Sequence, residues 1–320
     1  MQKNASIGDG TDTISVVVIV KNDPSIATTL LHLDRACLAL PRKPEVIVVD
    51  ASTTAEMAKM ATHYGEKVRW LFFKSVGTVD TRRSTIPGQR NLGISEANGS
   101  IIVFIDSGCS CEHYWLLNLT DPIVCEGEQI CVGGVRASSP LDRNWQTNTD
   151  TYIERGRRYV HEAGSGNMAV RKTVYEVVGA FDEGFSYGSD ADFAIRAIDS
   201  GFRIRYVSNA EIVHDWGDTK SQLKRATHYA EARVRLYRKH PRACKRLLGP
   251  DFVSLAYPLL VLGLPAAFLF PPLLLVLLIP LVKNMHNRPF KTLLLNTWYG
   301  ASILASVPRV VAESRRENRA

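Results

Sequence analysis

Three apolar runs in the first third of the chain end at polar side chains that could bind a ligand. They span residues 14–20, 45–50 and 101–106, and the last of them stops at Asp106. Runs of β-branched residues like these are typical of strands buried on both faces of a parallel sheet. Open α/β sheets bind ligands at the carboxyl ends of such strands. A carboxylate there suits a hard divalent cation, so we expect a nucleoside diphosphate carried with a metal at this edge.

Helical periodicity fills the stretches between these runs, so strands and helices alternate up to residue 106. Ile26, Leu30, Leu33 and Cys37, for example, share one helix face. This order predicts an α/β fold with a mainly parallel sheet flanked by helices. The expected strands are residues 14–20, 45–50, 68–73, 101–106, 130–135, 203–207 and 210–213. The expected helices, some of them only turn-like, are residues 23–40, 54–64, 114–119, 121–127 and 187–200. Another helix is expected to begin in the last part of residues 86–94 and to end at residue 98, and a short one is expected after Arg171.

Several short motifs follow one another in a fixed order along residues 14–216. They are Ile19-Val-Lys-Asn-Asp23, Val49-Asp-Ala-Ser52, Gly88-Gln-Arg-Asn-Leu-Gly93 and Asp106-Ser-Gly108. In this order they resemble the family 2 glycosyltransferases with the GT-A fold. The resemblance implies a nucleotide-binding sheet of GT-A type and an inverting sugar transfer from a nucleotide sugar.

The resemblance also implies which residues hold the donor. In the family the second strand ends in an acidic cluster that holds the nucleotide base, and the arginine of the Gly-x-x-Arg-Asn element lies on the diphosphate side. The donor-binding candidates are Asp50, Ser52, Arg90, Asn91, Asp106 and Ser107. The second aspartate of two family motifs is replaced here by Ala51 and Gly108. Asp50 has an alternative role as a strand-end turn residue.

A metal site is implied by Asp106 together with a distal histidine. The family often adds such a histidine, and His214 matches its position in Glu211-Ile-Val-His-Asp-Trp216. One carboxylate, two phosphate oxygens and water can satisfy Mg²⁺ or Mn²⁺. A nitrogen ligand favours Mn²⁺.

The family's general base is the final aspartate of a Glu-Asp pair, and the matching residue here is Asp190. Ser189 replaces the glutamate of that pair. A carboxylate beside the acceptor hydroxyl removes its proton as the hydroxyl attacks the anomeric carbon. The alternative is that Asp190 only caps the helix that follows. Asp192 is expected to pair with Arg196, one helical turn on.

The acceptor side is the least specific part of the resemblance. Its candidates are Asn167, Arg171, Asp192 and Trp216. For Asn167 and Arg171 the alternative is hydrogen bonding within a loop. For Trp216, which could stack on the acceptor, the alternative is packing in the core.

The C-terminal third combines basic and apolar segments. Residues 220–246 contain ten Lys or Arg and one acidic residue, and residues 253–282 carry no charge. Residues 220–240 have the pattern of an amphipathic interfacial helix, so we expect anionic membrane lipids rather than nucleic acid as partners. Five prolines interrupt the apolar run, which leaves a kinked spanning helix or a re-entrant hairpin. A buried core hairpin is the alternative.

We therefore expect three parts: a catalytic domain in residues 1–218, a basic juxtamembrane segment in 219–250, and an apolar membrane-anchoring or re-entrant helical tail in 251–320. Six cysteines show no disulfide framework or zinc spacing, which indicates a reducing compartment. Residues 1–13 contain no signal-peptide pattern. These features predict a protein at the cell membrane whose catalytic domain is cytoplasmic.

The predicted function is transfer of a sugar to a glycan or lipid-linked saccharide acceptor in the synthesis of a cell-envelope polysaccharide or glycolipid. Residues 222–226 echo a motif of processive synthases but lack its tryptophan, so single addition is favoured. The alternatives are a polyprenyl-phosphate sugar synthase, an inactive nucleotide-binding scaffold and a nucleotidyltransferase. The last would need a glycine-rich phosphate loop after the first strand.

Overall fold

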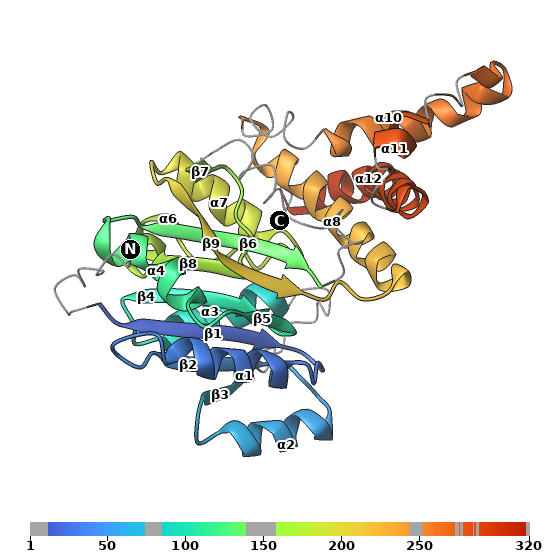
Figure 1. Cartoon of the computed structure of the whole chain (residues 1–320). Coiled ribbons are helices and arrows are strands. Elements are labelled where there is room, and N and C mark those ends of the chain that lie inside the picture. Colours follow the sequence, from blue (N-terminus) through green and yellow to red (C-terminus); the bar gives the residue numbers. More distant parts are fainter. Residues whose placement is uncertain are drawn as a thin grey trace. The chain divides into compact units, whose positions relative to one another are not determined.

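The computed structural model describes residues 12–73, 85–138, 158–242, 252–272, 275, 278–283, 285 and 288–317. The basic segment expected at residues 220–246 and the apolar run at residues 253–282 lie partly outside these residues. The described residues fall into two compact units, one ending at Asp215 and one beginning at Trp216 (Figure 1).

The first half of the N-terminal unit alternates strands and helices as the sequence predicts. Its four strands are mutually parallel and lie in the order β3-β2-β1-β4. The elements are β1 (Ile14–Val20), α1 (Ile26–Cys37), β2 (Glu45–Asp50), α2 (Ala55–Tyr64), β3 (Arg69–Phe72), α3 (Thr85–Glu96) and β4 (Ile101–Asp106). Because parallel strands end at the same sheet edge, the polar clusters after β1, β2 and β4 come together.

The second half makes the sheet mixed: the first four strands are parallel as expected, but of the later pairs that the structure describes β6 and β9 are parallel and the others antiparallel. Strand β8 is antiparallel to both of its neighbours, β4 and β6. Hydrophobic periodicity carries no information on strand direction, and the run that forms β8 was not recognised as a strand. The elements are β5 (Cys109–Cys111), α4 (Trp115–Cys125), β6 (Ile130–Ala137), β7 (Tyr159–Val160), β8 (Asn167–Arg171), α6 (Thr173–Val178), α7 (Ser189–Asp199) and β9 (Ile204–His214).

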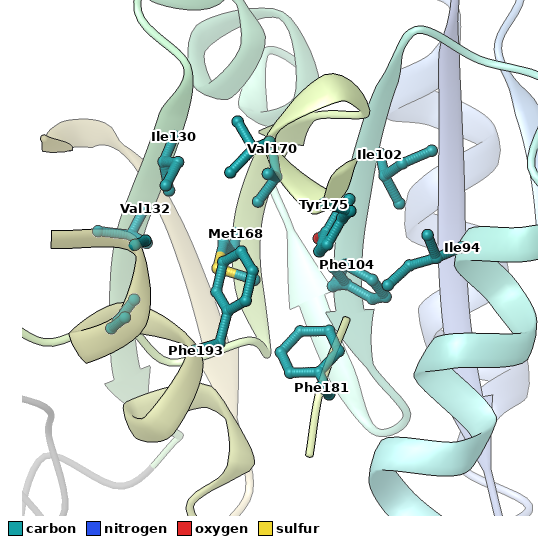
Figure 2. Packing of buried hydrophobic residues seen from close by; sticks show 14 of the residues in the cluster. Ile94, Ile102, Phe104, Ile130, Val132, Met168, Val170, Tyr175, Phe181 and Phe193 are labelled. Atoms are coloured by element: carbon teal, nitrogen blue, oxygen red, sulfur yellow. The ribbon is translucent and has the colours of Figure 1, made fainter. Parts of the chain in front are cut away.

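Aromatic side chains join helix α7 to the sheet. Phe104 of β4 meets Phe181 edge to face with ring centroids 5.6 Å apart, and Phe181 lies 5.3 Å from Phe193 of α7 (Figure 2). Phe193 is fully buried, and Tyr175 of α6 packs against it. Aromatic pairs of this geometry add to the free energy gained by burial. The cluster therefore fixes where α7 begins relative to β4.

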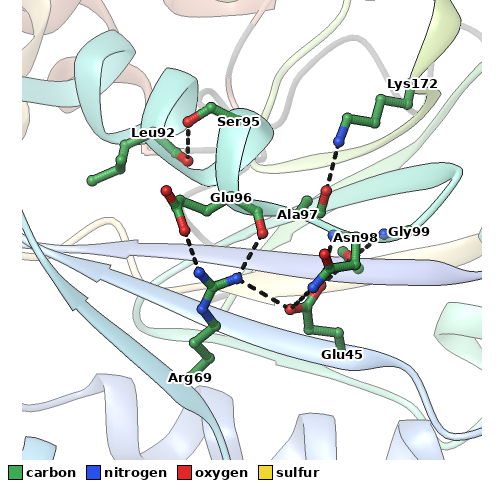
Figure 3. A network of polar contacts seen from close by, with 10 residues as sticks. Glu45, Arg69, Leu92, Ser95, Glu96, Ala97, Asn98, Gly99 and Lys172 are labelled. Carbon is green, nitrogen blue, oxygen red and sulfur yellow. Dashed lines mark hydrogen bonds and ion pairs between the residues drawn. The ribbon is translucent and has the colours of Figure 1, made fainter.

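A polar network fastens α3 and the turn that follows it to the start of β2 (Figure 3). Glu45 accepts hydrogen bonds from the backbone and side-chain nitrogens of Asn98 at 3.0 and 2.9 Å, and Arg69 forms ion pairs with Glu45 and Glu96. Burial alone would raise the pKa of Glu45, but hydrogen bonds from Ser15 and Asn98 outweigh burial and lower the pKa. The lowered pKa keeps Glu45 ionised at neutral pH, and the network holds α3 in place.

The C-terminal unit consists of helices, and α8 packs against α12. Its elements are α8 (Thr219–Lys239), α10 (Val253–Gly263), the 3₁₀ helix η2 (Leu264–Phe268), α11 (Leu278–Lys283) and α12 (Pro289–Glu317).

The predicted fold included an apolar C-terminal membrane segment, and that part of the prediction is wrong. No helix within the described residues has both the length and the apolar character needed to cross a bilayer. Proline removes a backbone donor from a helix, and Pro265 lies in the first turn of η2, whereas Pro258 lies inside α10 without ending it. The run is divided into helical pieces of 11, 5 and 6 residues, and the longer α12 carries Lys291, Arg309 and Glu313.

The amphipathic pattern expected for residues 220–240 is present, but its buried face serves internal packing. Ala226, Ala230 and Leu236 of α8 are buried. Trp298 of α12 donates a hydrogen bond from Nε1 to Thr227 Oγ1 at 2.9 Å. Part of the face that was expected to meet lipid thus meets α12.

Candidate active site

The ends of β1, β2 and β4 meet as the sequence predicts. In the strand registers Asp50 pairs with Val20 and Asp106 pairs with Ile19. The two carboxylates therefore flank the end of β1, one on each side.

Two residues after β1 connect the neighbouring loops. The backbone nitrogen of Asn22 donates to Ser52 Oγ at 2.7 Å, and Asn22 Oδ1 accepts from the nitrogen of Thr53 at 2.9 Å. Ser107 Oγ donates to Asp23 Oδ2 at 2.9 Å. The candidates Ser52 and Ser107 thus lie at the expected edge, and their hydroxyls join the three strand-end loops to one another.

Asp50 lies at the same edge but faces inward. It is 2% exposed; Oδ1 accepts from the backbone nitrogen of Ser52 at 2.7 Å and Oδ2 from the indole of Trp70 at 3.0 Å. Both carboxylate oxygens are therefore engaged in shaping the turn after β2, which agrees with the alternative of a strand-end turn residue.

Helix α3 contributes three consecutive polar residues. The buried Gln89 donates from Nε2 to the carbonyl oxygens of Val20 and Val49 at 2.9 and 2.7 Å. Arg90 Nη2 donates to Asp106 Oδ1 at 3.0 Å. Gln89 thus fixes α3 to the ends of β1 and β2, and the structure shows Arg90 holding a carboxylate.

Asn91 links α3 to the loop before α7. Its Nδ2 donates to Phe181 O and its Oδ1 accepts from Phe181 N, both at 2.9 Å, and Nδ2 also reaches Glu183 Oε1 at 3.0 Å. These two hydrogen bonds between the Asn91 side chain and the Phe181 backbone hold the loop against α3. Asn91 therefore lies near the edge, and its observed role is to position that loop.

Asp106 is partly exposed, whereas its partner Arg90 is buried. The Arg90 side chain is 7% exposed and the Asp106 side chain 36%. The second oxygen, Oδ2, lies against Gly166, where a Cβ atom would come within 2.7 Å of it. Glycine therefore leaves room for this carboxylate.

Asp190 lies in the first turn of α7, next to the same segment. Its Oδ2 accepts from the backbone nitrogen and the hydroxyl of Ser165 at 3.2 and 3.3 Å, and its Oδ1 accepts from Ala191 N at 2.9 Å. The N-cap position belongs to Gly188, so Asp190 does not cap the helix. Because Ser165 and Gly166 are consecutive, the structure brings Asp106 and Asp190 to one short segment.

His214 ends β9, where it pairs with Cys109 of β5, three residues after Asp106. Across the described residues, no group of three or more His, Cys, Asp or Glu side chains is placed to hold a metal. Asp106 and His214 stay the two ligands predicted from the sequence. Mg²⁺ is commonly bound through one or two carboxylates together with substrate phosphates and water. The residues fit a cation that binds together with a nucleoside diphosphate.

Arg171 does not belong to the candidate site. Strand β8 is antiparallel to β4, so Arg171 pairs with Ile101, which lies at the opposite end of β4 from Asp106. There it binds both oxygens of Asp12, at 2.7 and 3.0 Å. This bond lowers the pKa of Asp12.

Asn167 is fully buried at the start of β8. Its Nδ2 donates to the carbonyl oxygens of Gly134 and Ala210 at 2.7 and 2.8 Å, and its Oδ1 accepts from Trp115 Nε1 at 3.0 Å. An acceptor molecule cannot reach a side chain that is 0% exposed. Asn167 supports the site from within the core.

The other two acceptor candidates also have internal partners. Asp192 is fully buried and accepts from Arg196 Nε at 2.8 Å, which confirms the expected pairing. Trp216 belongs to the C-terminal unit, where the guanidinium of Arg225 lies 5.1 Å from its ring and donates to its carbonyl oxygen at 3.1 Å.

Sequence reasoning missed Gln89, Ser165 and Gly166. Gln89 binds backbone carbonyl groups and Ser165 binds one carboxylate. Hydrophobic periodicity does not predict either kind of contact. The run Gly164-Ser-Gly-Asn167 carried the only signal, because paired glycines mark close backbone approach.

The model of the family "Glycosyl transferase family 2" matches residues 15–182. Glycosyltransferase AglE of Haloferax volcanii is 22% identical over 231 residues, which cover 70% of this chain and 74% of that protein. The pre-mycofactocin glycosyltransferase of Mycobacterium tuberculosis is 25% identical over 187 residues, covering 54% of this chain and 39% of that protein.

Two solved structures share the fold. The mannosyltransferase PcManGT of Pyrobaculum calidifontis, in complex with GDP-Man and Mn²⁺, has a TM-score of 0.70 at 16% identity and covers 96% of this chain and 91% of its own. GalNAc-T7 with UDP, GalNAc and Mn²⁺ has a TM-score of 0.52 at 16% identity and covers 72% of this chain and 48% of its own. Since the family model spans more than half of the residues, the chain belongs to glycosyl transferase family 2 and is a glycosyltransferase with a GT-A α/β fold.

Proposed function

We propose that the chain transfers a sugar from a nucleotide-sugar donor to a saccharide acceptor with inversion at the anomeric carbon. The supporting observation is that Asp106 and Asp190 contact consecutive residues of one segment. One carboxylate at the donor edge and a second beside it match two tasks of the reaction, which are holding the cation that binds the diphosphate and deprotonating the acceptor. The family match ends at residue 182, so the role of Asp190 rests on this geometry and on the family motif.

In the proposed step the acceptor hydroxyl oxygen attacks the anomeric carbon. A new C–O bond forms, the bond to the diphosphate breaks, and the nucleoside diphosphate leaves with the electron pair. The hydroxyl proton moves to the carboxylate of Asp190. Arg90 holds Asp106 in place through the 3.0 Å bond, which keeps the donor side ordered.

We propose Asp106 and His214 as the residues that hold Mn²⁺ or Mg²⁺. When bound, the cation offsets the charge that develops on the leaving diphosphate. Two protein ligands leave most coordination positions to phosphates and water. We therefore expect the cation to bind tightly only with nucleotide, and weakly to the chain alone.

The neighbours suggest which donors to test first. PcManGT was solved with GDP-Man and GalNAc-T7 with UDP and GalNAc, both with Mn²⁺. A mannosyl donor on GDP and an N-acetylhexosamine donor on UDP are thus the first candidates, and identities of 16% leave the choice to experiment.

We propose a lipid-linked acceptor at the cytoplasmic face of the cell membrane, because nucleotide sugars are made in the cytoplasm. The C-terminal unit supports a surface-bound enzyme. Apolar side chains there are exposed, among them Leu259, Leu262, Leu269, Phe270, Ile279, Val282 and Phe290. Exposed basic residues of α8, including Lys224, Arg238 and Lys239, provide a charge that attracts anionic lipids. Such a unit would lie on the membrane without crossing it.

A vesicle experiment tests the surface proposal. The full chain should sediment with vesicles that contain anionic lipid, and the double variant Leu269→Asp/Phe290→Asp should stay in the supernatant. Sedimentation of both proteins to the same extent would contradict the role of these exposed side chains.

Donor turnover tests the function itself. The purified full chain is incubated with UDP-, GDP- and dTDP-sugars, with and without Mn²⁺ or Mg²⁺, and the released nucleoside diphosphate is measured. Turnover of one donor class with a saccharide acceptor supports the proposal. Transfer to bare polyprenyl phosphate would favour a polyprenyl-phosphate sugar synthase. Turnover no greater than in buffer for every donor would favour an inactive nucleotide-binding scaffold.

A further inference from the structure

The segment Gly164–Asn167 is anchored in the core at one end and meets the candidate site in its middle. The pairing of β6 with β9 shifts register between Gly133 and Val135. The amide of Asn167 donates to the carbonyl of Gly134, which lies within that shift. The anchor fixes the backbone of the two residues that precede Asn167.

Ser165 uses this anchored position to hold Asp190. It is fully buried, and both its backbone nitrogen and its hydroxyl donate to the same carboxylate oxygen, Oδ2. The other oxygen accepts from Ala191 N in the helix itself. These three donors are neutral groups that hold the carboxylate in one orientation.

Gly166 meets the other carboxylate. A Cβ atom at this position would lie 2.7 Å from Asp106 Oδ2 and 3.1 Å from its Cγ. The absence of a side chain is therefore a condition for the observed place of Asp106, and one backbone segment relates the two carboxylates to each other.

We propose that Ser165 is a positioning residue for sugar transfer: it orients Asp190, and together with Gly166 it sets the spacing between the base and the donor-side carboxylate. This inference rests on the proposed function. Substitutions of the two neighbouring residues should therefore have different effects: a change at Ser165 should affect the base, and a change at Gly166 should affect donor binding.

The test compares Ser165→Ala with Gly166→Ala in the full chain. Removing the Ser165 hydroxyl deletes one hydrogen bond to a charged group, so kcat should fall about tenfold, while the donor KM and the Kd of the nucleoside diphosphate stay unchanged. The methyl group of Gly166→Ala displaces Asp106, so the donor KM and the nucleotide Kd should rise. Ser95→Ala is the matched control, since it deletes an exposed hydroxyl that bonds only locally, to Leu92 O (Figure 3).

A lower kcat in Ser165→Ala with unchanged nucleotide affinity, together with weaker nucleotide binding in Gly166→Ala, supports the proposal. A wild-type kcat in Ser165→Ala overturns it, and so does an equal loss of nucleotide affinity in both variants, which would indicate a structural role. Ser165→Cys nearly retains the side-chain volume but is a weak donor. If Ser165→Ala folds poorly, an intermediate kcat in Ser165→Cys supports the proposal and an unchanged one overturns it. Absence of transfer by the wild-type chain with every donor would refute the proposed function instead.

Discussion

Replacing Asn167 by alanine tests whether this residue is a core anchor or an acceptor contact. The change removes the partners of three buried groups: the carbonyl oxygens of Gly134 and Ala210 and the indole nitrogen of Trp115. A buried polar group left without a partner costs about 1–3 kcal/mol. Partial relaxation reduces the sum, so we expect a loss of about 3–6 kcal/mol, a large share of the roughly 5–15 kcal/mol that stabilises a typical domain.

Thermal and urea unfolding of the full chain, followed by tryptophan fluorescence, measure this loss. For a domain of this size each kcal/mol lowers Tm by about 2–4 °C, so the fall should be about 6–24 °C. The control is Asn118→Ala, which removes one solvent-exposed hydrogen bond, to Asn209 O at 2.8 Å, and should cost below about 1 kcal/mol. If Asn167→Ala loses sugar transfer but has the same unfolding free energy as Asn118→Ala, the anchor role is refuted.

Three further predictions concern packing, thiols and pH. Gly93→Ala places a Cβ atom 2.4 Å from Val17 Cγ1 and should cost about 1–3 kcal/mol in urea unfolding, whereas Gly263→Ala, which meets open space, should be close to neutral. Burial raises the pKa of Cys37 to about 11 and that of Cys111 to about 12, so iodoacetamide at neutral pH should label the exposed Cys125 and spare both; mass spectrometry showing equal labelling would contradict their burial. The Arg171 bond lowers the pKa of Asp12 from its ordinary value of 3.8, so this pair stabilises the fold above that value and is lost as the pH falls through the lowered pKa. Asp12→Asn should therefore flatten the acid limb of stability against pH, and an unchanged limb would contradict this linkage.

The first half of the fold was predictable because strong periodicity and local rules agree there. The β-branched runs at residues 14–20, 45–50 and 101–106 were predicted with the bounds that the structure shows. Their polar ends therefore met at one edge as expected. The mixed second half was not predictable in this way, because the direction of β8 depends on tertiary pairing that no local pattern records.

The candidate site was predicted in position more reliably than in role. Asp106 and Asp190 lie on one segment, but Asp50 and Asn167 turn inward, where the structure uses them for hydrogen bonds. A motif fixes the position of a residue along the chain, whereas its direction depends on contacts with distant residues such as Trp70 and Trp115. The C-terminal prediction failed because the apolar run forms helical pieces of 11, 5 and 6 residues, and an apolar count does not show where such pieces begin and end.

Transfer by Asp190→Asn tests the central claim most directly. The account predicts that sugar transfer to the acceptor is lost while the affinity for the nucleoside diphosphate stays at the wild-type value, because the amide cannot take the acceptor proton. Asp199→Asn, at the other end of the same helix, should transfer normally. Wild-type turnover in Asp190→Asn would contradict the account.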